Sequence, residues 1–381
     1  MSKFKTTMQK ATRSQLLMPV MIFLLLIIIN MLVGTIFLSA DPILGANGKP
    51  LWINPSFFRI EPIVNTYGDT VWSGDIIRLI NGASELVLLA MGMTLVTAAC
   101  GGQDISVGAV GAIAGSVFVK VLSGAGAVTI PGILFAFLIC CVVTMICTSF
   151  SGALVAVFKI QPMIATLILF TAGRSIAYAV NGAASPKLYD AFTLQIGGFV
   201  SGVPIQTPIF IVVLFIILFG LLFKFTNLRL YTEAVGINEK SARLNGINPV
   251  VIKLLTFVIL GVCVAAAGFI SSCRMQRVDH LGMLGGIEMD AILAVAIGGN
   301  ALGGGKFSLT GSVIGAYTIE LLTRTLLKMQ VGPEAIKVYK ALFIILLMAA
   351  SSPVVKAHVI KLIDYLRKPS KKKMLAVKEG I

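Results

Sequence analysis

The sequence contains few charged residues and few of the residue types that build metal or catalytic centres. Only 12% of its 381 residues are charged and just two are histidine, whereas soluble globular domains carry roughly a quarter charged residues. The six cysteines lie within or at the ends of apolar runs and lack the spacing of metal ligands, so we expect them to be small buried hydrophobes. A dinucleotide fingerprint and an ATP-binding motif are also missing. The sequence predicts neither an enzyme nor a metal site.

Long apolar runs are abundant instead. Hydrophobic residues make up 57% of the chain, and its mean hydropathy is +0.96. Runs of about 20 apolar residues predict helical spans, because a helix of that length crosses the hydrocarbon core of a membrane. Ten runs lie at residues 16–39, 77–99, 105–122, 130–157, 162–181, 208–224, 250–272, 289–301, 309–328 and 338–355. The predicted fold class is an all-α polytopic membrane protein with about ten transmembrane helices in a single domain, residues 16–355.

The net charge of +15 indicates a membrane topology rather than nucleic-acid binding. When alternate loops are assigned to the cytoplasm, most lysines and arginines fall on that side, as the positive-inside rule requires. Residues 1–15 then form a basic cytoplasmic N-terminus. Residues 356–381 form a basic cytoplasmic tail that is expected to lie against anionic membrane lipid. The first run is too long for a signal-peptide core and is predicted to be an uncleaved span.

Two segments depart from simple helical spans. Residues 41–75 contain several prolines and glycines, which predict an external loop of irregular structure. The eighth run, 289–301, is too short to cross a core of about 30 Å at 1.5 Å per residue. It is predicted either to extend backward through residues 285–288 or to be a broken or re-entrant helix. Non-helical backbone at that depth must be packed in protein or line a wet cavity.

Two glycine-rich clusters, residues 101–108 and 298–306, interrupt the apolar pattern. In the first, Asp104 or Ser106 can cap the following helix; alternatively, Gln103 and Asp104 lie at the mouth of a translocation path. Each cluster leads into a helix with small residues at every fourth position, a spacing that lets helix backbones approach closely. The glycines expected to serve this packing are Gly111, Gly115, Gly311 and Gly315. The likeness of the two clusters is also compatible with an internal repeat.

Ionisable residues within the spans indicate function, because each costs about 2.5 to 3.5 kcal/mol at the bilayer centre. They are Glu85, Arg174, Glu288, Asp290 and Glu320. Glu288 and Asp290 are two residues apart and diverge on a helix, so one can face a pathway while the other caps a helix or meets Arg174. Structural ion pairs or caps remain the alternative for each residue. The predicted pathway residues are Gln103, Asp104, Arg174, Glu288, Asp290 and Asn300.

A polar segment of mixed charge, residues 226–249, lies between two long apolar runs. Such an insert must lie in water, and the charge pattern places it in the cytoplasm. Its composition is compatible with a short surface helix that another protein can grip.

Several motifs together resemble one known family. They are AMGMTLV at 90–96, GGQDISVG at 101–108, KIQPMIATL at 159–167, EAVGIN at 233–238, GIN at 246–248, EMDAILAV at 288–295 and GGNALGGG at 298–305. In this order they resemble the permease subunits of bacterial ABC importers for monosaccharides, such as the ribose, xylose and galactofuranose systems. The sequence departs from the family at Gln103, where an apolar residue is commoner, and in the long loop 41–75.

The resemblance implies a permease of the bacterial cytoplasmic membrane that works as a pair, either with a second copy or with a paralogue. It also implies two cytoplasmic ATPase subunits and an extracytoplasmic sugar-binding protein. No cofactor is expected on this chain, because the ATP and Mg²⁺ belong to the ATPase. The family's coupling helix, which docks on the ATPase, falls on Glu233, Ala234, Gly236, Asn238, Ala242, Gly246 and Ile247, where the small residues are expected to allow close docking.

Other functions remain open at this stage. Within the same class, the substrate could be a nucleoside or another small polar solute. An ion-coupled secondary transporter would use Glu85, Glu288 or Asp290 for proton coupling without an ATPase. A membrane-embedded enzyme would have to form a product in a sealed-vesicle assay.

Overall fold

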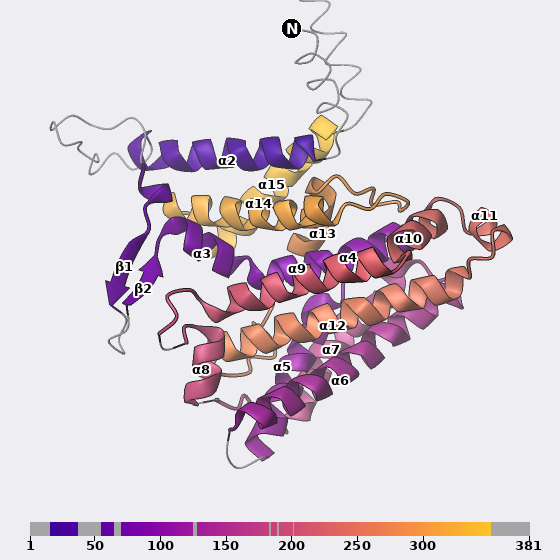
Figure 1. The fold of residues 1–381 in the computed structure, drawn as a ribbon, viewed down its shortest axis with the longest axis horizontal. Coiled ribbons are helices and arrows are strands. Elements are labelled where there is room, and N and C mark those ends of the chain that lie inside the picture. Colours follow the sequence, from indigo (N-terminus) through magenta and orange to yellow (C-terminus); the bar gives the residue numbers. More distant parts are fainter. Residues whose placement is uncertain are drawn as a thin grey trace, which may run out of the picture. The chain divides into compact units, whose positions relative to one another are not determined.

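The computed structural model describes residues 16–36, 55–64, 70–124, 128–182, 184–188, 190–200 and 202–351. The helices in the first two-thirds of this part are α2 (Leu17–Ile36), η1 (Pro55–Phe58), α3 (Asp75–Gly82), α4 (Ser84–Cys100), α5 (Val107–Gly124), α6 (Ile130–Ala156), α7 (Pro162–Val180), α8 (Ala191–Gly197) and α9 (Thr207–Phe225). They are followed by α10 (Leu228–Ile237), α11 (Glu239–Leu244), α12 (Pro249–Met275), α13 (Ile287–Ile297), α14 (Leu309–Lys328) and α15 (Pro333–Ser351). A helix lies in each of the ten apolar runs (Figure 1), so the predicted helical class is confirmed.

The chain divides into two compact units, residues 1–329 and 330–381. In the second unit the described helix is α15, whose first turn carries Glu334, paired with Lys337 at 3.2 Å. All other elements belong to the first unit. The predicted basic terminus 1–15 and tail 356–381 lie outside the described residues.

Five helices are long and apolar enough to cross a membrane: α5, α6, α7, α9 and α12. A sixth span is obtained if α3 and α4 are taken together, although they meet at an angle of 45°. This bend at Ala83 was not predicted from the apolar run 77–99. Helix α13 has only 11 residues, as the short eighth run indicates. The full count of ten spans and the cytoplasmic termini stay predictions.

The segment predicted to be irregular contains a β-hairpin. Strands β1 (Glu61–Val64) and β2 (Thr70–Ser73) pair antiparallel, with Pro62 opposite Trp72. The hairpin is tied to a distant loop, because the backbone N–H of Trp72 donates to the Pro204 carbonyl at 3.0 Å. The prediction of irregular structure is therefore wrong for this part of the loop.

Helix α4 lies in the core. Every residue from Ser84 to Ala99 is buried, as expected for a helix that is apolar around its whole circumference. Helix α12 packs against α4, α5 and α6 (Figure 1). The rings of Phe118, Phe137 and Phe269 join α5, α6 and α12, with centroid distances of 4.9 and 5.3 Å. Helix α14 packs against α2, α4 and α13.

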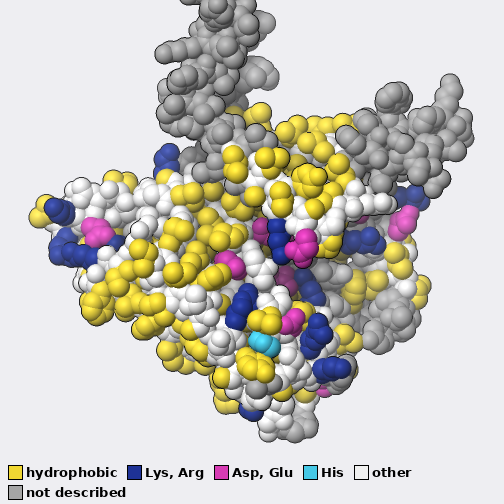
Figure 2. All heavy atoms as spheres, turned by 180° about the vertical axis from the view of Figure 1, so that it is seen from behind, with side chains coloured by type: hydrophobic (Ala, Val, Ile, Leu, Met, Phe, Trp, Pro, Cys, Tyr) yellow, Lys and Arg dark blue, Asp and Glu magenta, His cyan; other side chains and the backbone are white. Residues whose placement is uncertain are grey.

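The outer surface carries large apolar areas (Figure 2). Helices α6 and α9 also carry exposed apolar side chains, namely Leu134, Phe135, Leu138, Val142 and Ile146, and Phe210, Val213, Leu214, Ile217 and Leu218. Exposed apolar surface of this extent is typical of a contact with lipid or with another protein. The described part of the chain therefore has the surface of a multi-pass membrane protein.

Candidate functional site

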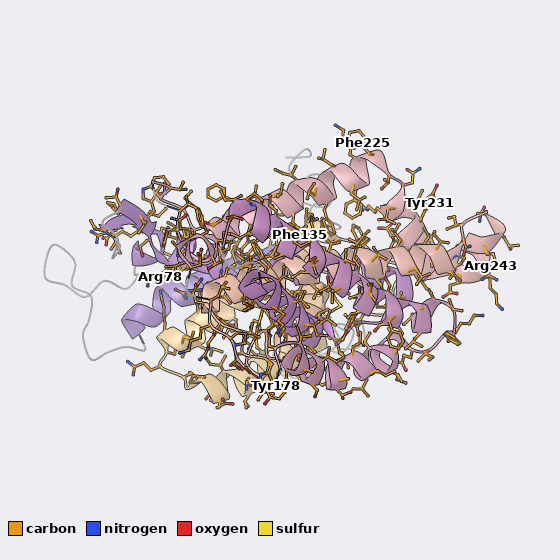
Figure 3. All side chains as sticks on the ribbon, turned by 90° about the horizontal axis from the view of Figure 1, so that it is seen from below. Arg78, Phe135, Tyr178, Phe225, Tyr231 and Arg243 are labelled. Carbon is orange, nitrogen blue, oxygen red and sulfur yellow. The ribbon has the colours of Figure 1, made fainter. Side chains whose placement is uncertain are left out.

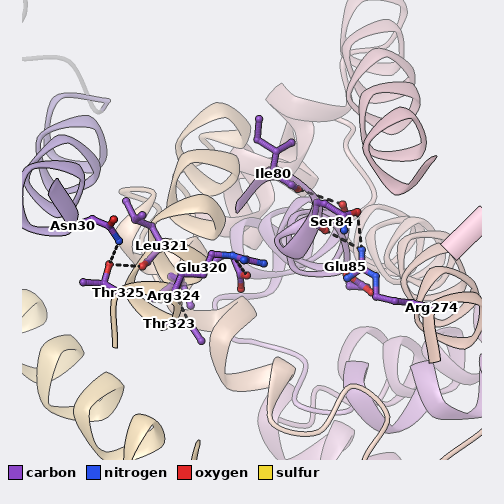
Figure 4. Close-up of polar contacts among 12 residues, drawn as sticks. Asn30, Ile80, Ser84, Glu85, Arg274, Glu320, Leu321, Thr323, Arg324 and Thr325 are labelled. Atoms are coloured by element: carbon purple, nitrogen blue, oxygen red, sulfur yellow. Dashed lines mark hydrogen bonds and ion pairs between the residues drawn. The ribbon is translucent and has the colours of Figure 1, made fainter. Parts of the chain in front are cut away.

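The bend between α3 and α4 is surrounded by ion pairs (Figure 4). Glu85, in the first turn of α4, accepts from Arg274 of α12 at 2.9 Å. Arg274 also donates to the side-chain oxygen of Asn81 at 3.0 Å. On the other side, Glu320 and Arg324 of α14 pair at 2.7 Å. Two of the acids within the spans, Glu85 and Glu320, are thus members of structural ion pairs.

Asp104 lies directly before the first turn of α5. One carboxylate oxygen accepts from the backbone N–H of Ser106 at 2.7 Å and from its hydroxyl at 2.6 Å. The other oxygen is buried and has no hydrogen-bond partner in the described part of the protein. Asp104 therefore orders the start of α5 and keeps one acceptor available.

Glu288 approaches the same helix from α13. An added Cβ on Gly108 would lie 2.3 Å from Oε2 of Glu288, so the carboxylate lies against the α5 backbone. This oxygen is also buried without a hydrogen-bond partner among the described residues. Asp290 is half-buried. Asp104 and Glu288 thus present two unsatisfied carboxylate oxygens beside the first turn of α5.

Residues 276–286 form a non-helical segment before α13. Arg174 of α7 donates to the carbonyls of His280, Leu281 and Met283 at 2.8 to 3.2 Å. Backbone donors at Gly282 and Leu281 hold the pKa of Asp279 below its ordinary value. Arg174 therefore fixes the backbone of this segment.

The end of this segment is packed within the bundle. Met283 is fully buried, and its side chain lies against Gly115 of α5. Gly286 has φ +80° and comes directly before α13, a conformation that favours glycine. The non-helical approach to α13 is therefore anchored in the bundle through Met283, whereas Gly285 and Gly286 next to the helix are exposed.

The two glycine clusters meet in space. An added Cβ on Gly101 would lie 2.7 Å from the carbonyl oxygen of Gly303. Gln103 donates to the Leu302 carbonyl at 3.1 Å, and Gly305 donates to the carbonyl of Ala98 at 3.0 Å. The side-chain amide of Gln103 therefore bonds to the facing loop.

Asn300 organises the second cluster. Its side-chain nitrogen donates to Val295, Ser308 and Ser312 at 2.8 to 3.3 Å. Its oxygen accepts from the backbone N–H of Ser308 at 2.6 Å. The amide therefore bonds at both its nitrogen and its oxygen, to the end of α13, the following loop and the start of α14, so the geometry supports a structural role for Asn300.

Replacing Asn300 by alanine is expected to destabilise the helical bundle by about 1 to 3 kcal/mol, because it leaves buried donors and acceptors unsatisfied. The measurement is the thermal unfolding midpoint of the purified protein in detergent. Asn245→Ala is the matched control, since Asn245 is exposed and its side chain donates to the carbonyl of Ser241 at 2.9 Å. Equal midpoints for the two variants would contradict this role.

The four packing glycines lie at close helix contacts. An added Cβ would be 2.1 Å from the Gly298 carbonyl oxygen at Gly311, and 2.1 Å from that of Ala294 at Gly315. At Gly111 the nearest atom belongs to Leu284 at 2.5 Å, and at Gly115 Met283 and Ser272 are both at 2.4 Å. The second pair therefore permits α13 and α14 to approach backbone to backbone, and the first pair receives side chains of the non-helical segment.

The polar segment forms α10 and α11, whose inner face is packed on the bundle. At Gly236 an added Cβ would lie 1.8 Å from the carbonyl oxygen of Ala98. Ala242 is buried in a cluster with Val235 and Ile252, against which Ile247 packs. Lys253 of α12 pairs with Glu239 of α11. The structure thus places Gly236 and Ala242 on the face of the segment that packs on the bundle.

The other predicted residues of this segment shape its turns and its surface. Asn238 accepts from the backbone N–H groups of Lys240 and Ser241 and so caps α11. Glu233 pairs with Arg229 at 3.5 Å, and Ala234 is half-buried. Gly246 has φ +79° and no neighbour within 4 Å of an added Cβ.

Two residues that the sequence did not single out form the outward face of the segment. Ile237 is 73% exposed and Leu244 is 89% exposed. They lie among polar and charged residues such as Lys240 and Arg243, and Figure 3 shows Arg243 at the end of the bundle far from Arg78. The sequence feature that could have identified them is the presence of isolated aliphatic residues in a polar, water-exposed segment.

Comparison with known proteins decides the class. A family model described as a branched-chain amino acid transport system permease component matches residues 76–351. The chain belongs to this family of transport permeases. All seven motifs lie within the matched residues of the permease. Helix α2 and the β-hairpin precede them.

Individual relatives are transport permeases from several bacteria. The galactofuranose transporter permease of Escherichia coli K12 is 38% identical over 73% of this chain and 80% of its own length. The fructose import permease of Bifidobacterium longum is 34% identical over 74% and 78%. The ribose import permease of Haemophilus influenzae is 31% identical over 79% and 88%. The predicted resemblance is thereby confirmed. No solved structure matches the permease.

Proposed function

We propose that this permease translocates a monosaccharide across the bacterial cytoplasmic membrane as the membrane subunit of an ABC importer. Cytoplasmic ATPase subunits drive alternating access, and an extracytoplasmic sugar-binding protein delivers the substrate. The permease works as a dimer with a second copy or a paralogue. It holds no cofactor of its own, and the ATP and Mg²⁺ are bound by the ATPase. The names of the three relatives support the sugar as substrate.

The outward face of α10 and α11 is the observation that best supports docking of an ATPase subunit. Ile237 and Leu244 are aliphatic, exposed and held on an anchored segment. Exposed apolar side chains rimmed by charge are typical of a protein interface. Because Lys253 and the buried Ala242 fix the segment on the bundle, a partner that grips Leu244 would move the bundle with it.

Fewer of the predicted pathway residues remain candidates for contact with the substrate. The side chains of Gln103, Arg174 and Asn300 already donate hydrogen bonds to backbone carbonyls. Asp104 and Glu288 each retain a buried carboxylate oxygen without a partner among the described residues. Sugar hydroxyls can donate to such oxygens, and these two acids are therefore the proposed pathway contacts.

Transport by purified components tests the proposal. Proteoliposomes that contain the permease, its ATPase and its binding protein should take up the binding protein's monosaccharide only with ATP. Uptake by the permease alone along a proton gradient would instead support an ion-coupled transporter. The pairing of Glu85 with Arg274 argues against Glu85 as the proton-coupling acid of such a transporter, because that acid must be able to change its charge. Uptake of a nucleoside in place of the sugar would revise the substrate only.

Leu244→Asp is expected to weaken binding of the ATPase at least tenfold, because a charge replaces an apolar side chain at the interface. The variant should fold normally, since Leu244 is 89% exposed. Co-purification of the ATPase with the permease measures the effect. Ile60→Asp is the matched control, because Ile60 is also exposed but lies beside the hairpin. ATPase binding that is equally strong in both variants would exclude Leu244 from the docking surface.

A further inference from the structure

A cavity of about 260 Å³ lies at the end of the bundle that carries the hairpin. Four elements line it: α2, η1, α3 and α14. Its lining residues are Asn30, Phe57, Asp75, Arg78, Leu321, Arg324, Leu327 and Lys328. Since α2 and η1 precede the residues that match the family model, half of the elements around this cavity lie outside the matched core.

Most polar groups of the cavity are engaged with one another. Lys328 donates to Asp75 at 2.5 Å and to the side-chain oxygen of Asn30 at 3.2 Å. Its ammonium group lies 5.9 Å from the ring centroid of Phe57. The guanidinium of Arg324 is paired with Glu320 at 2.7 Å, as Figure 4 shows. Two of the three cations in the wall therefore have carboxylate partners.

Arg78 is different. It donates to the hydroxyl of Ser73 at 3.3 Å, and no carboxylate within the described residues forms an ion pair with it. The three cations Arg78, Arg324 and Lys328 are thus balanced by two acids, Asp75 and Glu320. The wall of the cavity therefore has a net charge of +1. Arg78 is exposed, and one hydrogen bond leaves most of its guanidinium donors available. The planar fork of a guanidinium suits the bidentate binding of a phosphate or carboxylate.

The neighbourhood of the cavity suits a lipid. Lys328 is the last residue of α14 and ends the predicted span 309–328, and lipid headgroups lie at the ends of membrane spans. Leu327 lines the cavity and is 50% exposed. The outer face of α2 continues with exposed apolar side chains, namely Leu24, Leu25, Ile28 and Ile29. A lipid whose anionic headgroup binds Arg78 would therefore have an apolar surface along which its acyl chains can lie.

We propose that this cavity binds the phosphodiester headgroup of a membrane phospholipid, with Arg78 as the principal anion ligand. A phosphodiester carries one negative charge, which balances the excess charge of the wall. The Asp75–Lys328–Asn30 network holds the cavity in shape between α2, α3 and α14. The bound lipid would tie α2 to the core of the permease.

Native mass spectrometry of the purified full-length permease with added phosphatidylglycerol tests this site. One phosphatidylglycerol per chain should bind with high affinity, and Arg78→Gln should lower that affinity about tenfold, because a charge-assisted hydrogen bond is lost. Arg59→Gln is the matched control: Arg59 is exposed, lies near the hairpin and is paired with Glu61. Its affinity should equal that of the wild type.

Two further probes identify the source of the phosphate. A phosphate-free diacylglycerol glycolipid should fail to occupy the site. Glycerol 3-phosphate, which is soluble, should fail to displace the phospholipid even at millimolar concentration. Displacement by glycerol 3-phosphate would overturn the lipid and assign the cavity to a soluble phosphate ester. Equal lipid binding by Arg78→Gln and Arg59→Gln, or no bound phospholipid in the wild type, would overturn the site itself.

Discussion

Gly236→Ala is expected to abolish uptake by the permease and to impair its folding. The added methyl group would lie 1.8 Å from the carbonyl oxygen of Ala98 and 2.7 Å from the backbone nitrogen of Gly305. Both neighbours are backbone atoms, so neither can move aside as a side-chain tip would. Because Ala98 also accepts from Gly305, the substitution would separate α10 from α4 and from the loop before α14. Overpacking of this kind costs about 1 to 3 kcal/mol or more.

Gly220→Ala is the control for this prediction. Gly220 lies within α9, and nothing lies within 4 Å of an added Cβ there, so alanine should be neutral or slightly stabilising in the helix. Yield of folded protein and ATP-dependent uptake measure both variants. A Gly236→Ala permease that folds but no longer binds the ATPase would show that Gly236 acts in docking instead. Wild-type uptake would contradict the close contact.

Arg274→Met is expected to lower the stability of the permease by about 3 to 5 kcal/mol, because it leaves the buried carboxylate of Glu85 without its partner. The side chain of Glu85 is only 8% exposed, and Arg274 lies 2.9 Å from it. Arg274 also holds Asn81, so its loss should loosen the bend between α3 and α4. Thermal unfolding in detergent measures the change.

A second substitution separates the lost charge pair from lost packing. Adding Glu85→Gln to Arg274→Met removes the unpaired charge, and we expect it to restore most of the stability. Arg59→Met is the surface control: Arg59 pairs with Glu61, both side chains are more than half exposed, and such pairs contribute at most about 1 kcal/mol. If Arg274→Met were no more harmful than Arg59→Met, the ion pair could not be holding the bend.

The apolar runs predicted the helices well, because a membrane span must satisfy its backbone hydrogen bonds within one helix. They could not predict the break at Ala83. Residues 77–99 read as one apolar run, and the bend is surrounded by Arg274, Glu320 and Arg324 from distant helices. The hairpin was missed for a similar reason, since its strands are four residues each and too short to show an alternating pattern.

The sequence predicted which polar residues belong to the candidate site, but it did not predict which contacts each of them makes. Asp104 and Asn300 were both polar residues in glycine-rich turns, and the sequence could not show that Asn300 satisfies both ends of its amide locally. It also could not show that Asp104 keeps one carboxylate oxygen unpaired. In the polar segment, the positions of Gly236 and Leu244 depend on which face packs on α4 and α12, and short helices carry too few turns to reveal that face.

Helix α12 connects the polar segment at one end of the bundle with the bend between α3 and α4 at the other. It runs without interruption through 27 residues, a length of about 40 Å at 1.5 Å per residue. Near its start Lys253 is bonded to α11, and near its end Arg274 is bonded to Glu85. A tilt of about ten degrees around its midpoint displaces each end by about 3 Å, given that length. That distance is enough to make or break a hydrogen bond, so a small push on α11 can open or close the Arg274–Glu85 contact at the far end.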